Sequence, residues 1–250
     1  SVFQKLNHTS TTNGREQLRK NLSTPLPTIE AITEVQQTVK LILAHQENWP
    51  TQITNGTIMV VERFYEYTFD RLPNHVSSFA AMSYKFLHGP DYSLIKYSII
   101  HCFDFIKGIQ LFTERFLKEG CPAPLKKILE AAKRSIEAVP LQIIAENKKA
   151  ADLTIPQQLQ LAQYIRYHYK QHMLALVAMH AQLDAWYGMA MTVKKYGLTF
   201  PGFVESKQPM LEVKGLYHIL LQQPVPYDVQ LVPESNFLFL TGANMAGKST

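Results

Sequence analysis

The sequence has only two cysteines, no long hydrophobic run and no export signal. Cys102 and Cys121 lie outside any CxxC or Cys/His spacing, which argues against a zinc site and predicts two reduced thiols. No apolar run is long enough to span a membrane, and the first residues lack the form of a signal peptide. These absences predict a cytoplasmic protein without a membrane partner. The chain also lacks a starting methionine and stops abruptly, which suggests a fragment of a longer protein.

The composition is that of a folded globular protein. The 250 residues are 46% hydrophobic and 18% charged, which is enough for one large domain or two modest ones. The formal charge of +5 permits contact with nucleic acid through its phosphates but does not require it.

Two compositional regions meet near residue 196. The first is helical in pattern, and in the second, from Gly197 onward, Pro and Gly separate short apolar runs. We predict helices from Val2 to about Leu22, from a Thr28 N-cap to about His45, from about Gly56 onward, and over 93–119 and 124–138. We predict strands at 199–204, 210–213, 225–231 and 237–241.

The clearest predicted element is a long helix that begins after Thr154 and ends at Tyr196. Thr154 and Gln157 have the spacing of a capping box, and Gly197 suits the position after the last turn. A continuous helix of this length would extend roughly 60 Å, long enough for a spacer or a lever. Its apolar face comprises Leu161, Ile165, Tyr169, His172, Leu176, Met179, Leu183, Tyr187, Ala190 and Val193.

The last nine residues match the P-loop pattern GxxxxGK followed by Ser or Thr. In such a loop, glycines let backbone amides approach phosphate oxygens, Lys248 would neutralise the β- and γ-phosphates, and the Ser249 hydroxyl would ligate Mg²⁺. The apolar run 236–241 has the form of the strand that feeds the loop. The predicted nucleotide-binding residues are Gly242, Ala243, Asn244, Met245, Ala246, Gly247, Lys248, Ser249 and Thr250.

A P-loop ATPase also needs an acidic residue on another strand to hold Mg²⁺ and orient water, and no such strand follows within these residues. We therefore expect the full-length protein to use ATP and Mg²⁺. This chain alone should be inactive and should bind nucleotide weakly or not at all.

The interior of the loop is more specific than the general pattern. The run 241–250 resembles the TGxNMxGKST loop of the MutS family of DNA mismatch repair ATPases. The segments 12–19, 183–185 and 224–229 are similar to further segments of that family. The resemblance implies a mainly α fold: residues 1–196 form a helical lever domain with a very long last helix. Residues 197–250 form the β-rich start of the ATPase domain, cut at the P-loop.

The family's activity implies a lever that couples ATP binding and hydrolysis to the binding of mismatched or branched DNA. It also implies a homodimer through the missing part of the ATPase domain. By the same resemblance, Val225 would lie beside the nucleotide base. Two residues depart from the family pattern: Tyr227 stands where Asn is usual, and Ala243 stands where Pro is commonest.

Other departures leave a second function open. The stretch from Pro124 to Pro156 is helical in pattern and has no room for the β-rich DNA clamp of the family. An ATP-switched protein-interaction scaffold that does not contact DNA is therefore the alternative. Phe64-Tyr65-Glu66 matches the family's DNA-wedging tripeptide, but its position predicts that Phe64 belongs to the core. The basic residues over 126–149 alternate with glutamates, which predicts a solvated helix face with local ion pairs.

Overall fold

The computed structural model describes residues 1–68, 72–73, 76–239 and 241. It divides the chain into two compact units. We call Leu6–Thr199 the helical unit, and Phe200–Thr250 together with Ser1–Lys5 the C-terminal unit. The sequence analysis placed the boundary at residue 196 and did not anticipate that the first five residues group with the end of the chain.

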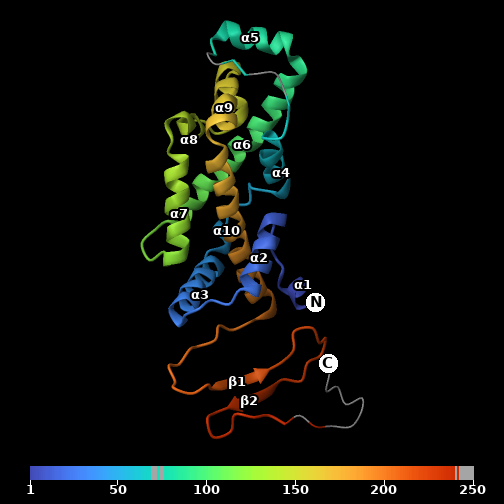
Figure 1. Cartoon of the computed structure of the whole chain (residues 1–250), viewed down its shortest axis with the longest axis vertical. Coiled ribbons are helices and arrows are strands. Elements are labelled where there is room, and N and C mark those ends of the chain that lie inside the picture. The colour runs from blue at the N-terminus through green and yellow to red at the C-terminus, as the bar shows by residue number, and fades with distance from the viewer. Residues whose placement is uncertain (69–71, 74–75, 240, 242–250) are drawn as a thin grey trace. The chain divides into compact units, whose positions relative to one another are not determined.

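The described part of the chain is mainly helical, as predicted, and carries one small antiparallel sheet (Figure 1). Short 3₁₀ turns connect several of the helices. The helices are α1 (Val2–Leu6), α2 (Thr12–Ser23), α3 (Ile29–Ala44), α4 (Asn55–Phe64), α5 (Ser78–Leu87), α6 (Gly89–Phe116), α7 (Ala123–Ile136), α8 (Gln142–Glu146), α9 (Ile155–His168) and α10 (Lys170–Tyr196). The strands are β1 (Leu211–Leu216) and β2 (Tyr227–Leu231).

Two long helices organise the helical unit. α10 packs against α2, α3, α7 and α9, while α6 packs against α4, α7 and α9. The aromatic side chains of Phe103, Phe105 and Phe112 on α6 are fully buried between these neighbours. Burial of each such ring stabilises the fold by about 1.5–3 kcal/mol relative to an exposed ring. The core therefore lies along α6 and α10.

Local capping signals were predicted correctly. Thr28 Oγ1 accepts a hydrogen bond from Ala31 N at 3.2 Å at the start of α3. At the start of α9, Gln157 Oε1 accepts from Thr154 N at 2.8 Å. Gly197 adopts a left-handed conformation, with φ of 61°, directly after α10. These features depend on neighbours in sequence, which is why the sequence alone identified them.

The prediction of a single helix from Val2 to about Leu22 is wrong, because the chain is not helical between α1 and α2. Thr11 is the N-cap of α2, and its Oγ1 accepts a hydrogen bond from Gly14 N at 3.0 Å. The amides of Ser10 and Thr11 instead bind the distant carboxylate of Asp184. A tertiary acceptor thus replaces two helical hydrogen bonds.

The prediction of one continuous helix up to Tyr196 is also wrong, because the helix is interrupted at Tyr169, between α9 and α10. Tyr169 N donates to Tyr164 O, five residues earlier, at 3.1 Å. The buried Tyr169 hydroxyl donates to Ser135 O of α7 at 2.6 Å. A wide turn of this kind moves the next buried position by one residue, while Leu176, Leu183 and Ala190 of the predicted face are buried as expected. Met173 is therefore buried, while His172 from the predicted apolar face is exposed.

Candidate nucleotide-binding segment and its connection to the helices

The P-loop itself lies outside the described residues. This applies to Gly242, Ala243, Asn244, Met245, Ala246, Gly247, Lys248, Ser249 and Thr250, including the hydroxyl predicted to ligate Mg²⁺. Of the predicted nucleotide-binding residues, the structure describes Val225 alone.

A short hairpin precedes the P-loop in the C-terminal unit. β1 and β2 pair in antiparallel register, with Val213 opposite Val229 and Leu216 opposite Tyr227. The register shifts between the two pairs at Gly215, whose φ is 66° and whose amide donates to Asp228 Oδ1 at 2.8 Å. The hairpin thus coincides with two of the predicted strands, at 210–213 and 225–231.

Val225 lies two residues before β2, between Pro224 and Pro226. Its side chain is 83% exposed. The flanking prolines restrict the backbone here, so Val225 is presented from a stiff segment. A rigid, exposed branched side chain can pack on a flat ring, and its contact with a nucleotide base stays a prediction.

Two predicted strands are not formed in the described residues. Neither 199–204 nor 236–239 has ladder partners. Phe237, Leu238 and Phe239 are all exposed. A β-strand needs a neighbouring strand to form hydrogen bonds with its backbone N–H and C=O groups, and a run of apolar residues does not provide that neighbour. The run before the P-loop is therefore irregular here.

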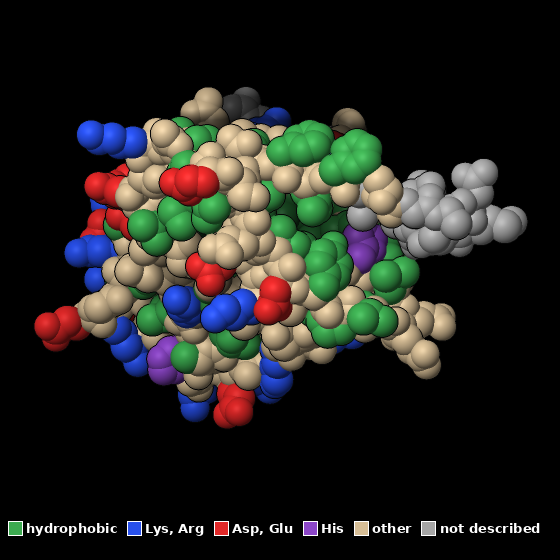
Figure 2. All heavy atoms as spheres, turned by 90° about the horizontal axis from the view of Figure 1, so that it is seen from below, with side chains coloured by type: hydrophobic (Ala, Val, Ile, Leu, Met, Phe, Trp, Pro, Cys, Tyr) green, Lys and Arg blue, Asp and Glu red, His purple; other side chains and the backbone are tan. Residues whose placement is uncertain are grey.

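The C-terminal unit has no core of its own within 200–239 and 241, because none of these residues is buried. Figure 2 shows the molecule from below, where hydrophobic side chains gather at the surface among polar ones. Large apolar residues from several parts of the unit are exposed, including Phe203, Val204, Met210, Leu211, Leu221, Val225, Tyr227, Phe237, Leu238 and Phe239.

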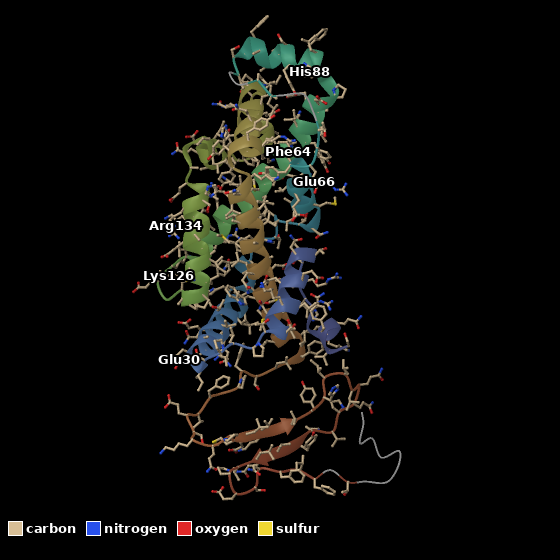
Figure 3. All side chains as sticks on the ribbon, in the orientation of Figure 1. Glu30, Phe64, Glu66, His88, Lys126 and Arg134 are labelled. Atoms are coloured by element: carbon tan, nitrogen blue, oxygen red, sulfur yellow. The ribbon has the colours of Figure 1, made fainter. Side chains whose placement is uncertain are left out.

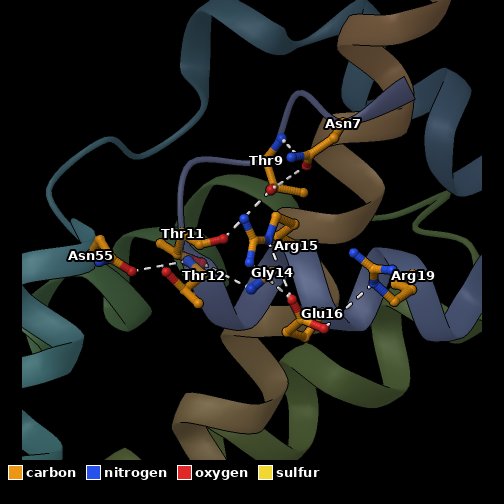
Figure 4. Close-up of polar contacts among 9 residues, drawn as sticks. All are labelled: Asn7, Thr9, Thr11, Thr12, Gly14, Arg15, Glu16, Arg19 and Asn55. Atoms are coloured by element: carbon orange, nitrogen blue, oxygen red, sulfur yellow. Dashed lines mark hydrogen bonds and ion pairs between the residues drawn. The ribbon is translucent and has the colours of Figure 1, made fainter. Parts of the chain in front are cut away.

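The strongest polar cluster of the helical unit joins its N-terminal segment to α10. The Asp184 carboxylate accepts hydrogen bonds from Ser10 N at 2.9 Å, from Thr11 N at 2.9 Å and from Thr11 Oγ1 at 2.7 Å. Asp184 is 1% exposed, so these charge-assisted bonds replace its lost hydration. The segment is further fixed by Thr12 N, which donates to Asn55 Oδ1 of α4 at 2.9 Å (Figure 4).

The absence of a side chain at two glycines makes this cluster possible. A Cβ on Gly14 would lie 2.1 Å from Asp184 Oδ2, and a Cβ on Gly188 would lie 2.9 Å from Thr9 Cγ2. Both distances are too short for real atoms, so only glycine lets the chain approach α10 this closely. Neither Gly14 nor Asp184 was assigned a role from the sequence, because their contact joins residues 170 positions apart.

A second contact links Leu6, the first residue of the helical unit, to the last turns of α10. Thr192 Oγ1 donates to Leu6 O at 2.7 Å, four residues before the end of α10. The chain passes between the two units after Lys5 and again after Thr199. Thr192 and Asp184 therefore hold the first residues of the helical unit, Leu6 and residues 10–11, against α10.

A buried histidine adjoins this cluster. His180 lies one helical turn before Asp184, and its ring packs edge-on against Phe105 and Phe112. Burial lowers the pKa of His180 to about 4, and the nearby Asp184 carboxylate opposes the shift. The imidazole is therefore neutral at physiological pH.

Phe64 and the basic face of α7 have the structural roles that the sequence predicted: Phe64 lies in the core, and α7 carries ion pairs on its surface. Phe64 is 0% exposed, and the Arg166 guanidinium lies 5.5 Å from its ring centroid and donates to its carbonyl. Figure 3 shows Phe64 within the helices and Lys126 and Arg134 on the outer side of α7. Lys126 lies 3.9 Å from Glu130, so this basic face carries local ion pairs.

No protein-family model matches this sequence. Within the described ranges, no three His, Cys, Asp or Glu side chains group closely enough to hold a metal ion. None of the described helices combines the length and apolar character needed to cross a bilayer.

Proposed function

We propose that this chain is the lever domain and the start of the ATPase domain of a MutS-like DNA repair protein. The lever couples ATP binding and hydrolysis at the P-loop to the binding of mismatched or branched DNA. The single observation that carries this proposal is the TGANMAGKST sequence of residues 241–250, placed after a helical domain whose last long helix leads towards it.

The packing of the helical unit supports the proposal. Two of the segments that resemble the MutS family, 12–19 and 183–185, are in contact through Gly14 and Asp184. A lever must transmit force without local yielding. The buried Asp184 carboxylate accepts three hydrogen bonds from Ser10 and Thr11, directly before the first segment, and so resists movement of α2 relative to α10. Nucleotide-driven movement at the C-terminal unit would reach α2 and α10 together.

The C-terminal unit supports it in a different way. A segment whose described residues, 200–239 and 241, include many exposed large apolar side chains and no buried ones does not make an independent domain. This agrees with the proposal that residues 197–250 are the first part of a larger ATPase domain, whose remainder would cover them.

ATP hydrolysis by the proposed full-length protein tests the enzymatic part. We expect Mg²⁺-dependent hydrolysis that Lys248→Ala reduces by at least about 100-fold, because the loop loses its phosphate-neutralising charge. Lys207→Ala, at an exposed lysine of the same unit, is the matched control and should retain activity. Equal rates for both variants would refute the role of the P-loop. The 250-residue chain alone should give no micromolar Mg-ATP affinity in calorimetry.

A second candidate is an ATP-switched scaffold that binds proteins and not DNA. The observation that favours it is the stretch between Pro124 and Pro156, every residue of which the structure describes and which contains no strand. Lys126 and Lys133 of α7 moreover form ion pairs with Glu130 and Glu137. Crosslinking that recovers protein partners from cells, with no nucleic acid retained at low salt, would favour the scaffold.

A further inference from the structure

α5 carries an exposed apolar face that the proposed function does not use. Phe79, Met82 and Phe86 follow one another at helical spacing and are 83%, 57% and 88% exposed. Leu87 flanks them and is 72% exposed. We call these four residues the α5 stripe. A contiguous exposed apolar patch of this size on a helix is typical of an interaction site, whereas single exposed apolar residues are common on any surface.

The opposite face of α5 is already used within the fold. Ala81 and Tyr84 are buried, and α5 packs against α6 and α9. Figure 1 shows α5 at one end of the helical unit, away from α2 and α3. The helix is thus held in place by one face and presents the α5 stripe outward on the other.

We propose that the α5 stripe is the contact surface for a second copy of this chain, with the two α5 helices packed antiparallel about a twofold axis. The stripe is nearly symmetric about its own midpoint, since Phe79 and Phe86 lie at equal distances from the peptide between Met82 and Ser83. A twofold axis at that point sets Phe79 of each copy opposite the other copy's Phe86, with the two Met82 side chains at the centre. This is the self-complementarity that an isologous interface requires.

The area is sufficient for such a dimer. With roughly 200 Å² for each aromatic side chain, the two phenylalanines expose about 340 Å², and Met82 and Leu87 raise the stripe to about 600 Å². Two copies would bury up to about 1,200 Å², which is the lower end of the range for specific interfaces. We therefore expect a dissociation constant in the range of about 1–100 μM.

The charge of α5 favours this occupant over nucleic acid or lipid. Lys85 is the one charged residue of the helix, and its ammonium group lies 5.6 Å from the Tyr92 ring centroid. Phosphate backbones and anionic bilayers are bound by several cations beside the contact surface. An uncharged stripe also meets its own copy without like-charge repulsion.

Sedimentation velocity of the 250-residue chain between 1 and 200 μM tests the proposal. A monomer–dimer equilibrium is expected, and Phe79→Glu with Phe86→Glu should weaken it at least about 30-fold. The matched control, Met59→Glu with Leu174→Glu, changes two exposed apolar residues of α4 and α10 and should leave it unchanged. A chain that is monomeric at 200 μM, or one that instead floats with anionic vesicles while monomeric, would overturn the proposal.

A crosslink separates this contact from association through the exposed apolar residues of the C-terminal unit. In a Cys121→Ser background, Ser83→Cys lies next to the proposed axis and should give a covalent dimer with a short bis-maleimide. Lys127→Cys, exposed on α7, should not. Adding Phe86→Glu should abolish the crosslink. If the chain forms a dimer but the Ser83→Cys variant gives no crosslink, the proposed surface is contradicted. This result is independent of whether the protein hydrolyses ATP.

Discussion

Replacement of Gly14 by alanine should destabilise the helical unit far more than the same change elsewhere. The added Cβ would lie 2.1 Å from Asp184 Oδ2 and 2.6 Å from Asp184 Cγ, so the carboxylate must move. Its movement weakens the bonds from Ser10 N and Thr11 N, and each bond to a charged acceptor contributes about 1.5–3 kcal/mol. The higher helix propensity of alanine offsets about 1 kcal/mol of this loss in the free energy of unfolding. The net loss should be about 2–5 kcal/mol.

Urea unfolding followed by circular dichroism at 222 nm measures this loss, because the helical unit dominates the helix signal. Gly56→Ala is the matched control: it lies in the first turn of α4, and its Cβ would meet only Thr54 Oγ1, at 3.6 Å. That variant should be unchanged or stabilised by up to about 1 kcal/mol. A Gly14→Ala variant as stable as Gly56→Ala would refute the role of the close approach to Asp184.

Two further changes test the core and the buried histidine. Phe64→Ala should cost about 3–5 kcal/mol in urea unfolding, since the ring is fully buried, and a loss below about 1 kcal/mol would contradict its placement in the core. His180 has a lowered folded pKa of about 4, so the unfolded state binds the proton more readily, and stability should fall as pH decreases from about 6.5 towards 4. The loss should total about 3 kcal/mol, and a His180→Phe variant should lack that part of the slope. Parallel pH profiles of the two proteins would contradict the burial of a neutral imidazole.

The sequence predicted those elements whose signals are local. The Thr28 and Thr154 caps and the Gly197 terminus each depend on residues within one turn, and all three are present. The buried positions of α4, including Phe64, follow from helical spacing alone. These parts required no knowledge of the tertiary structure.

The missed features depend on contacts between residues far apart in sequence. The break before Thr11 exists because Asp184, more than 170 positions later, accepts its amide. The break at Tyr169 accompanies a hydrogen bond to Ser135 on another helix. α5 was missed because apolar residues occupy both of its faces, so no single 3.6-residue stripe identifies it. The nucleotide-binding residues after Thr241 stay a prediction from their sequence pattern.

Nucleotide-dependent DNA binding tests the proposed coupling most directly. Fluorescence anisotropy of labelled mismatched and branched duplexes should be measured at low salt with the proposed full-length protein, with and without Mg-ATP. We predict binding whose affinity changes at least about tenfold with ATP, and loss of that change in Lys248→Ala. No DNA binding in either state, or an affinity that ATP does not alter, would contradict a lever that connects the two.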